Sequence, residues 1–410
     1  MTPSERPALS AFLAHRRNAQ TEFLADLVRS PSDNPPGDCA PHANRTAELL
    51  EELGFTDEKH PVPADIARAH GMRSVTNLVV RRRFSEGLVA ALNAHGDVVP
   101  PGDGWTADPY GAEIRDGWMY GRGAAVSKSD IATYTFALAA LEHADATLHG
   151  TVELHITYDE ETGGELGPKW LLEQGISKPD IAIGAGFSYA AVTAHNGVLH
   201  LEVEVTGRSA HAAKPYTGID ALEAATAILS RLYAWRAGLT ARASAVPGIG
   251  APQLTVGLIS GGINTNVVPD KVTFRLDRRI VPEEDPAEVE RELREVIAGA
   301  GGTFSAARVD VRRIMLAAPL TPLPGGQVLT DLLCAHATRI MGEPVVATGV
   351  PLYTDARHYA AAGIPIVLYG AGPHTIEDAN AHRADERLPL ADLHKATEVV
   401  ALTLSDVLAG

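Results

Sequence analysis

The chain has 410 residues, enough for roughly two or three domains with sizeable cores. Its 35 Lys and Arg residues are outnumbered by 51 Asp and Glu residues, and the net charge of −16 argues against nucleic acid or an anionic membrane as the main partner. The two cysteines, Cys39 and Cys334, can build neither a disulfide framework nor a cysteine zinc cluster. The sequence lacks an apolar run of about 18 residues and an apolar N-terminal segment, so we expect a soluble cytoplasmic protein.

The elements expected in the first part of the chain alternate between helices and short apolar strands. Helices are expected at 1–30, 44–53 and 131–143. Strands are expected at 77–80, 88–92 and 152–158, and another at 364–369. This alternation favours an α/β fold, in which helices flank a mostly parallel sheet on both faces.

The pattern changes near residue 196. Residues 198–205 and 272–277 alternate apolar and polar side chains, as half-exposed antiparallel strands do. Helices are expected at 221–235 and 286–298, the second with Asp285 as its N-cap and Pro286 in its first turn. We therefore predict an α+β domain over residues 196–316, inserted into an α/β domain formed by residues 1–195 and 317–410.

Two polar clusters follow expected strands and carry residue types suited to metal chemistry. His95 and Asp97 suit a metal-binding imidazole with its orienting carboxylate, although a hydrogen-bonded histidine in a turn shows the same pattern. Asp159, Glu160 and Glu161 place three carboxylates after an apolar strand, where burial is costly unless a cation or proton compensates. One carboxylate can ligate a metal while its neighbour acts as general base on a bound water. The alternative is an exposed acidic turn.

Three further segments are weak signals by themselves. His211 and His382 are single histidines, and most single histidines are not ligands. The segment 121–129 ends in Lys-Ser, but Ser127 stands where a phosphate-binding loop needs a glycine, so we do not expect a nucleotide site.

Taken together, these motifs appear in a specific order along nearly the whole chain. The order is Ala94–Pro100, Tyr120–Ala124, Asp159–Glu161 with Gly163 and Gly164, Gly207–Ala213, Gly261–Gly262 with Asn266–Pro269, Asp277–Arg279, and Ala381–His382 with Asp385 and Glu386. It resembles the metallopeptidase family that includes aminoacylase, acetylornithine deacetylase, succinyl-diaminopimelate desuccinylase and carboxypeptidase G. That resemblance implies a catalytic α/β domain with two metal ions and an inserted lid domain that usually forms a homodimer.

The resemblance also implies roles for individual residues. His95, Glu161 and His382 would be metal ligands, Asp97 would orient His95, and Glu160 would be the general base. A second group of residues would act on the substrate. His211 would reach the site of the partner protomer and polarise the scissile carbonyl, while Asn266 and Arg279 would bind the substrate, often through a carboxylate.

Two positions depart from the family pattern. Val126 stands where the family has a metal-bridging aspartate, and Ala185 stands where it has an acidic ligand. The remaining set of two histidines and one carboxylate predicts one divalent metal ion per protomer, with manganese, zinc and iron all suitable. Asp130, Asp355 and His374 lie in neighbouring motifs and are candidates for replacement ligands.

We therefore expect a metal-dependent hydrolase that cleaves a C–N bond of a small carboxylate-bearing substrate. Metal-activated water would attack, Glu160 would take and return the proton, and His211 would stabilise the developing negative charge. One alternative is an aromatic amine hydrolase that releases ammonia, like the family's nitroanthranilate aminohydrolase. The other is a metal-free, catalytically silent binding homologue, motivated by the missing ligands.

Overall fold

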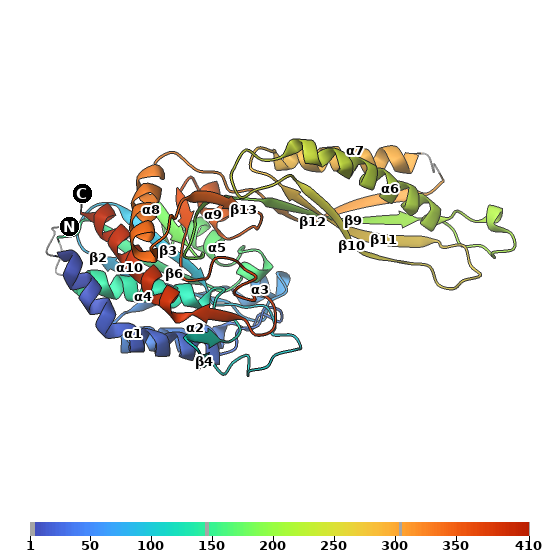
Figure 1. Ribbon diagram of the computed structural model, residues 1–410. Helices are drawn as coiled ribbons and strands as arrows, with labels where there is room; N and C mark the ends of the chain where they lie inside the picture. Colours follow the sequence, from blue (N-terminus) through green and yellow to red (C-terminus); the bar gives the residue numbers. More distant parts are fainter. Residues whose placement is uncertain (1–4, 144–146, 303–305, 410) are drawn as a thin grey trace. The chain divides into compact units, whose positions relative to one another are not determined.

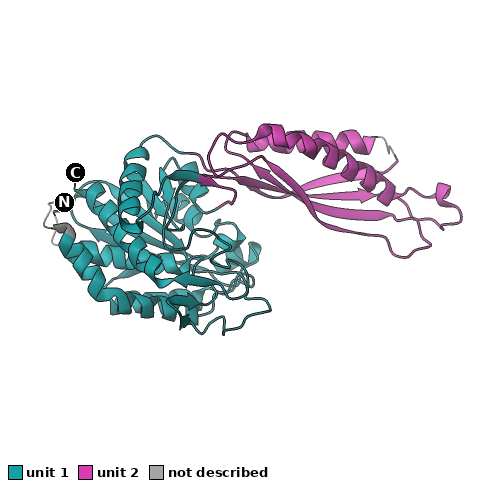
Figure 2. Ribbon diagram, in the orientation of Figure 1, with its two compact units in different colours: residues 1–193, 322–348, 354–410 teal, residues 194–321, 349–353 magenta. Residues whose placement is uncertain are grey.

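The computed structural model describes residues 5–143, 147–302 and 306–409. The chain divides into two compact units (Figure 2), unit 1 formed by residues 1–193, 322–348 and 354–410, and unit 2 by residues 194–321 and 349–353. The segment 349–353 thus groups with unit 2, although its position in the sequence places it in the α/β domain. Across the described residues, no helix has both the length and the apolar character needed to span a bilayer.

The larger sheet has eight strands in the order β1-β2-β6-β3-β7-β14-β8-β13. Their bounds are β1 Asp57–Pro61, β2 Thr76–Arg83, β3 Val89–His95, β6 Thr151–Thr157, β7 Ile181–Gly184, β8 Ala191–His195, β13 Ala347–Val350 and β14 Ile366–Leu368. The four central strands β6, β3, β7 and β14 run parallel, while β1, β2 and β8 pair antiparallel at the flanks. A mostly parallel central sheet confirms the predicted α/β class.

Helices cover this sheet (Figure 1). They are α1 Glu5–Arg29, α2 Ala40–Glu52, α3 Ala64–Ala69, α4 Lys128–His143, α5 Pro168–Glu173, α8 Gln327–Met341, α9 Ala356–Ala361 and α10 Leu390–Leu408. Residues 1–4 of the first expected helix lie outside the described residues. Helix α2 begins at Ala40 rather than Asn44, because Pro41 is tolerated in a first turn, where its missing N–H would have no intrahelical partner.

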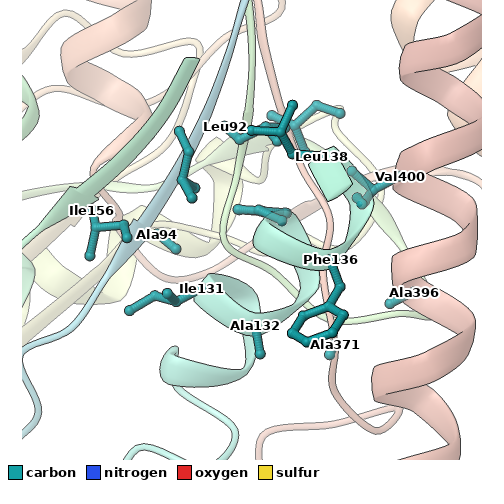
Figure 3. Packing of buried hydrophobic residues seen from close by; sticks show 14 of the residues in the cluster. Leu92, Ala94, Ile131, Ala132, Phe136, Leu138, Ile156, Ala371, Ala396 and Val400 are labelled. Atoms are coloured by element: carbon teal, nitrogen blue, oxygen red, sulfur yellow. The ribbon is translucent and has the colours of Figure 1, made fainter. Parts of the chain in front are cut away.

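Helix α4 lies between the sheet and a second layer of helices. It packs on β3 and β6, while α1 and α10 pack against it. Figure 3 shows both sides of this helix: Leu92 and Ile156 of the strands lie on one side of α4, and Phe136 points to the other side, where α10 carries Val400. A helix that is apolar on all sides, as α4 is, requires cover on both faces. This core fixes the strand ends that carry the polar clusters.

Unit 2 has an antiparallel four-stranded sheet in the order β10-β11-β9-β12. Its strands are β9 Gly197–Thr206, β10 Gln253–Gly261, β11 Lys271–Ile280 and β12 Arg308–Ala317, and its helices are α6 Ala221–Arg236 and α7 Pro286–Gly301. The helices cover one face, where alternate residues of β9 and β11 are buried. As predicted, the Asp285 carboxylate caps α7 by accepting the N–H of Ala287 at 2.7 Å. A small sheet of β4 Glu113–Arg115, β5 Trp118–Tyr120 and β15 Arg387–Pro389 completes the fold.

Candidate metal centre

The carboxyl ends of two neighbouring parallel strands bring the first polar clusters together. Strands β3 and β6 pair in a register that places His95 opposite Thr157, so the residues after β6 emerge beside His95. One ligand atom from each of His95, Glu160 and Glu161 lies within 4.8 Å of the others. His382, from the loop before β15, brings its Nε2 to 3.3 Å from Glu161 Oε1. The fold therefore gathers four of the residues singled out in the sequence.

The orientation of the His95 ring follows from one hydrogen bond. Its Nδ1 lies 2.9 Å from the backbone carbonyl oxygen of Asp97. Because a carbonyl can only accept, Nδ1 carries a proton, so in the neutral form of the ring Nε2 keeps its lone pair. That Nε2 lies 4.0 Å from Glu160 Oε2, on the side of the carboxylates. The neutral ring thus offers Nε2 as a metal-binding nitrogen.

The Asp97 carboxylate connects the two strand-end clusters. It is fully buried and accepts the backbone N–H groups of Glu160 at 3.3 Å and Glu161 at 3.2 Å. It also accepts Asn34 Nδ2 at 2.9 Å. Asp97 therefore fixes the backbone that presents both glutamates, a contact that sequence spacing does not reveal.

Negative charge dominates the cluster. Burial alone would lower the pKa of His95, but Asp97 and Glu160 raise it well above its usual range. Burial, opposed by the charge of His95 and assisted by those of Glu161 and Asp97, raises the pKa of Glu160 to about 7. The Glu161 carboxylate raises the pKa of His382. A buried excess of carboxylates is the setting in which a bound cation supplies the missing positive charge.

Asp355 has two buried carboxylate oxygens that no hydrogen-bond donor reaches, whereas the buried Glu161 Oε1 has His382 Nε2 beside it at 3.3 Å. Asp355 is 5 % exposed and occupies the N-cap position of α9, yet its side chain makes no capping hydrogen bond. It lies against the turn that follows Glu161, because a Cβ on Gly164 would come within 2.0 Å of Asp355 Oδ1. Uncompensated buried carboxylate oxygens are costly, so they indicate a missing partner.

The two other candidate replacement ligands are engaged elsewhere. Asp130 accepts the N–H of Ala371 at 2.8 Å and of Gly186 at 3.1 Å, which fastens the segments after β14 and β7. His374 lies on the surface, 2.7 Å from Glu343. Of the three, Asp355 alone combines proximity to Glu160 with oxygens that lack donors.

Asp159, the first of the three adjacent acids, turns away from its neighbours. It is 2 % exposed, and its Oδ2 accepts the N–H of Leu166 at 2.5 Å. Val126 packs against the core of unit 1, and Ala185 donates its N–H to the carbonyl of Asn93 at 2.9 Å. Neither of these apolar side chains offers a ligand atom.

The loop that carries His382 is held by residues to which the sequence assigned no role. Asn380, His382 and Asp385 all adopt positive φ, a strained backbone for residues other than glycine. Glu386 fastens the end of this loop: it pairs with Arg122 at 2.6 Å and accepts the N–H of Ala125 at 3.0 Å. Both charged side chains are almost fully buried. Arg122 and Glu386 each belong to a motif of the family pattern, but only the fold shows that their ion pair joins the segment around Arg122 to the loop of His382.

The remaining predicted residues belong to unit 2. His211 is exposed, and its backbone bridges to Val267, while the N–H of Ala212 donates to the Asn266 carbonyl at 3.0 Å. The structure thus brings the His211 and Asn266 loops side by side. Arg279 lies on β11, with Nε 3.0 Å from Asp277 Oδ1.

Comparisons with known proteins agree on one family. The model of Peptidase family M20/M25/M40 matches residues 91–406. The chain is 29% identical over 402 residues to a succinyl-diaminopimelate desuccinylase of Rhodospirillum centenum (94% of this chain, 96% of the relative) and 30% identical over 393 residues to an acetylornithine deacetylase of Proteus mirabilis (92% and 94%). An M20-family metallo-carboxypeptidase of Sulfolobus solfataricus shares the fold, with a TM-score of 0.75 at 18% identity, covering 96% of this chain and 98% of the other.

Proposed function

Because the chain belongs to Peptidase family M20/M25/M40, we propose that it is a metal-dependent hydrolase that cleaves an amide-type C–N bond of a small carboxylate-bearing substrate. The family consists of metallopeptidases and related deacylases, so the expectation of an enzyme acting on C–N bonds is confirmed. The substrate, the residue roles and the metal count are our proposal. The observation that carries it is the cluster of His95, Glu160, Glu161 and His382.

These residues fit a divalent metal ion. Two imidazoles and a carboxylate suit zinc, manganese or iron, and Glu161 Oε1 with His382 Nε2 at 3.3 Å places two of these donor atoms side by side. Bound there, the ion would lower the pKa of a water molecule and polarise the scissile carbonyl. Enzymes of this family typically bind two ions. Since Val126 and Ala185 remove two ligands, we propose one ion per protomer, with Asp355 as the carboxylate available to complete its surroundings.

Glu160 is the residue best placed to move a proton. Its Oε2 lies beside the ligand nitrogen of His95, and its backbone is fixed by Asp97. A pKa of about 7 lets its carboxylate take a proton from the attacking water and return it to the leaving nitrogen at neutral pH. Glu161 is the ligand and Glu160 the base, because only Glu161 also approaches His382.

His211 is equipped to donate a hydrogen bond. The N–H of Ala213 donates to its Nδ1 at 3.1 Å, so the neutral ring carries its proton on Nε2. An exposed Nε2–H can stabilise negative charge that develops on a carbonyl oxygen. We propose a homodimer in which His211 of one protomer serves the site of the other, and in which Asn266 and Arg279 bind the substrate.

The test combines metal content with a substrate screen. Protein purified without an affinity metal is assayed by elemental mass spectrometry and then incubated with N-acyl amino acids and with aminobenzoates. About one metal per protomer and release of free amino acid support the proposal. Release of ammonia from an aromatic amine would replace it with aryl amine hydrolysis. Absence of metal after soaking, together with no turnover, would indicate a silent binding homologue.

A further inference from the structure

Strand β11 places two adjacent arginines on opposite faces of the unit 2 sheet. Helices α6 and α7 cover one face of this sheet (Figure 1). Arg278 lies on that face, fully buried, with Nη2 2.6 Å from Glu284 Oε1 and its guanidinium 5.7 Å from the Trp235 ring centroid. The Arg279 side chain points to the other face and is 33% exposed. Because side chains alternate along a strand, Arg278 is a structural residue and Arg279 is accessible to a ligand.

The face that carries Arg279 is otherwise a surface of matched charges. Arg275 pairs with Glu202 at 2.7 Å, and Arg312 reaches the same carboxylate at 2.7 Å. Arg279 differs, because Asp277 contacts only its Nε. Within the described part of the chain, Nη1 and Nη2 of Arg279 make no side-chain hydrogen bond or ion pair. The two Nη groups, which can bind a planar carboxylate through two parallel N–H bonds, are therefore left open.

The reason that Asp277 uses one oxygen on Arg279 is His200. His200 on β9 lies directly opposite Asp277 in the strand register, and its Nε2 is 2.8 Å from Asp277 Oδ2. Oδ1 faces Arg279 Nε at 3.0 Å. Because both oxygens are engaged, Asp277 cannot rotate to accept hydrogen bonds from Nε and Nη of Arg279 at once. That bidentate geometry is the one that arginine–carboxylate pairs favour.

We propose that His200 and Asp277 are positioning residues that hold Arg279 with both Nη groups open, forming a receptor for the carboxylate of the substrate. The inference rests on the proposed function in two respects, that the substrate carries a carboxylate and that Arg279 binds the substrate. It goes beyond it by assigning specificity to two residues that would not touch the substrate. Without the His200 donor, Asp277 can bind Nε and Nη of Arg279 together. Arg279 then no longer offers both Nη groups to the substrate carboxylate.

The test compares substrates with and without the carboxylate. KM and kcat are measured for the best N-acyl amino acid of the screen and for its carboxamide analogue, in wild type, H200L, H200Q and R279Q. H200L is expected to raise KM for the acid roughly fivefold with little change in kcat and none for the carboxamide. H200Q keeps an N–H donor and should restore KM toward wild type. E202Q, which disturbs the neighbouring ion pairs on the same face, is the matched control and should leave KM unchanged.

Two outcomes would overturn the inference. One is an unchanged acid-to-carboxamide preference in H200L, and the other is a loss in kcat that is equal for both substrates and is not rescued by H200Q. If no acyl amino acid is hydrolysed, the proposed function fails, and the receptor is tested by NMR titration with succinate. Binding to wild type that weakens in H200L and R279Q but not in E202Q still supports the receptor, whereas no binding to wild type refutes it.

Discussion

His382 Nε2 lies 3.3 Å from Glu161 Oε1, which joins the loop before β15 to the segment that follows β6. The Glu161 side chain is 6% exposed and that of His382 is 52% exposed, so the pair links the interior of unit 1 to solvent. The contact does not depend on these side chains alone, since the buried Arg122–Glu386 pair fastens the end of the His382 loop. Glu161 and His382, which are far apart in the sequence, are thereby held close enough to bind the same metal ion.

Replacing Glu160 by glutamine and replacing Glu161 by glutamine are expected to affect metal content and activity differently. E160Q should keep the metal and lose activity by roughly 10²–10⁴-fold, the range for removing a general base. E161Q should lose both metal and activity, because a ligand is removed. Metal content by elemental mass spectrometry, measured beside kcat, separates the two. Equal metal loss in both variants would contradict the assignment of Glu160 as base.

Asp355→Asn tests whether this carboxylate serves the metal. If it does, the variant should bind the metal roughly 10–100-fold more weakly, as removal of supporting groups around metal sites does. Metal affinity is measured by competition with a chelator. D130N is the comparison variant, since Asp130 contacts backbone N–H groups instead, and it should affect thermal stability more than metal affinity. An unchanged affinity in D355N would assign Asp355 a purely structural role.

His211→Ala should lower kcat by roughly 10²–10³-fold, the cost of removing one donor to a developing oxyanion. The melting temperature should not change, because the side chain is exposed. His374→Ala removes another exposed histidine outside the cluster and serves as the control.

Mixing H211A with E160Q tests the dimer itself. If His211 of one protomer serves the site of the other, the hybrid dimer contains one complete site and regains part of the activity. No recovery in a mixture that light scattering shows to contain dimers would place His211 in the site of its own protomer. A monomer would remove the shared site altogether.

Glu153 is expected to make stability depend on pH. Burial alone would raise its pKa, but hydrogen bonds from His155, Ser177 and Arg81 lower it to about 2. Because the folded-state pKa lies below the unfolded value, the contribution is present above about pH 4.5 and disappears as the pH falls toward 2. E153Q should therefore cost roughly 1–3 kcal/mol at pH 7 and progressively less in acid. Urea unfolding at pH 7, 4 and 3 measures this, and a difference that does not vary with pH would contradict it.

Local patterns in the sequence account for much of the fold. Apolar runs followed by His95 or by Asp159–Glu161 predicted strands that end in polar clusters, and β3 and β6 have that form. The alternation in residues 198–205 predicted a strand with one buried face, as found in β9. These features follow from short-range periodicity and from the alternation of side chains along a strand, so they can be predicted without a structure.

Tertiary structure decided which polar residues remain available for chemistry. Asp130, Asp355 and His374 were equivalent candidates in the sequence, yet one is bonded to backbone N–H groups, one is buried without donors and one pairs with Glu343 on the surface. Likewise, Arg278 and Arg279 are adjacent in the sequence but lie on opposite faces of one sheet. The motifs in the sequence indicated the family and the types of side chain that could take part in the chemistry. The availability of each side chain depended on partners from segments distant in the sequence, which only the packed structure brings within hydrogen-bond range.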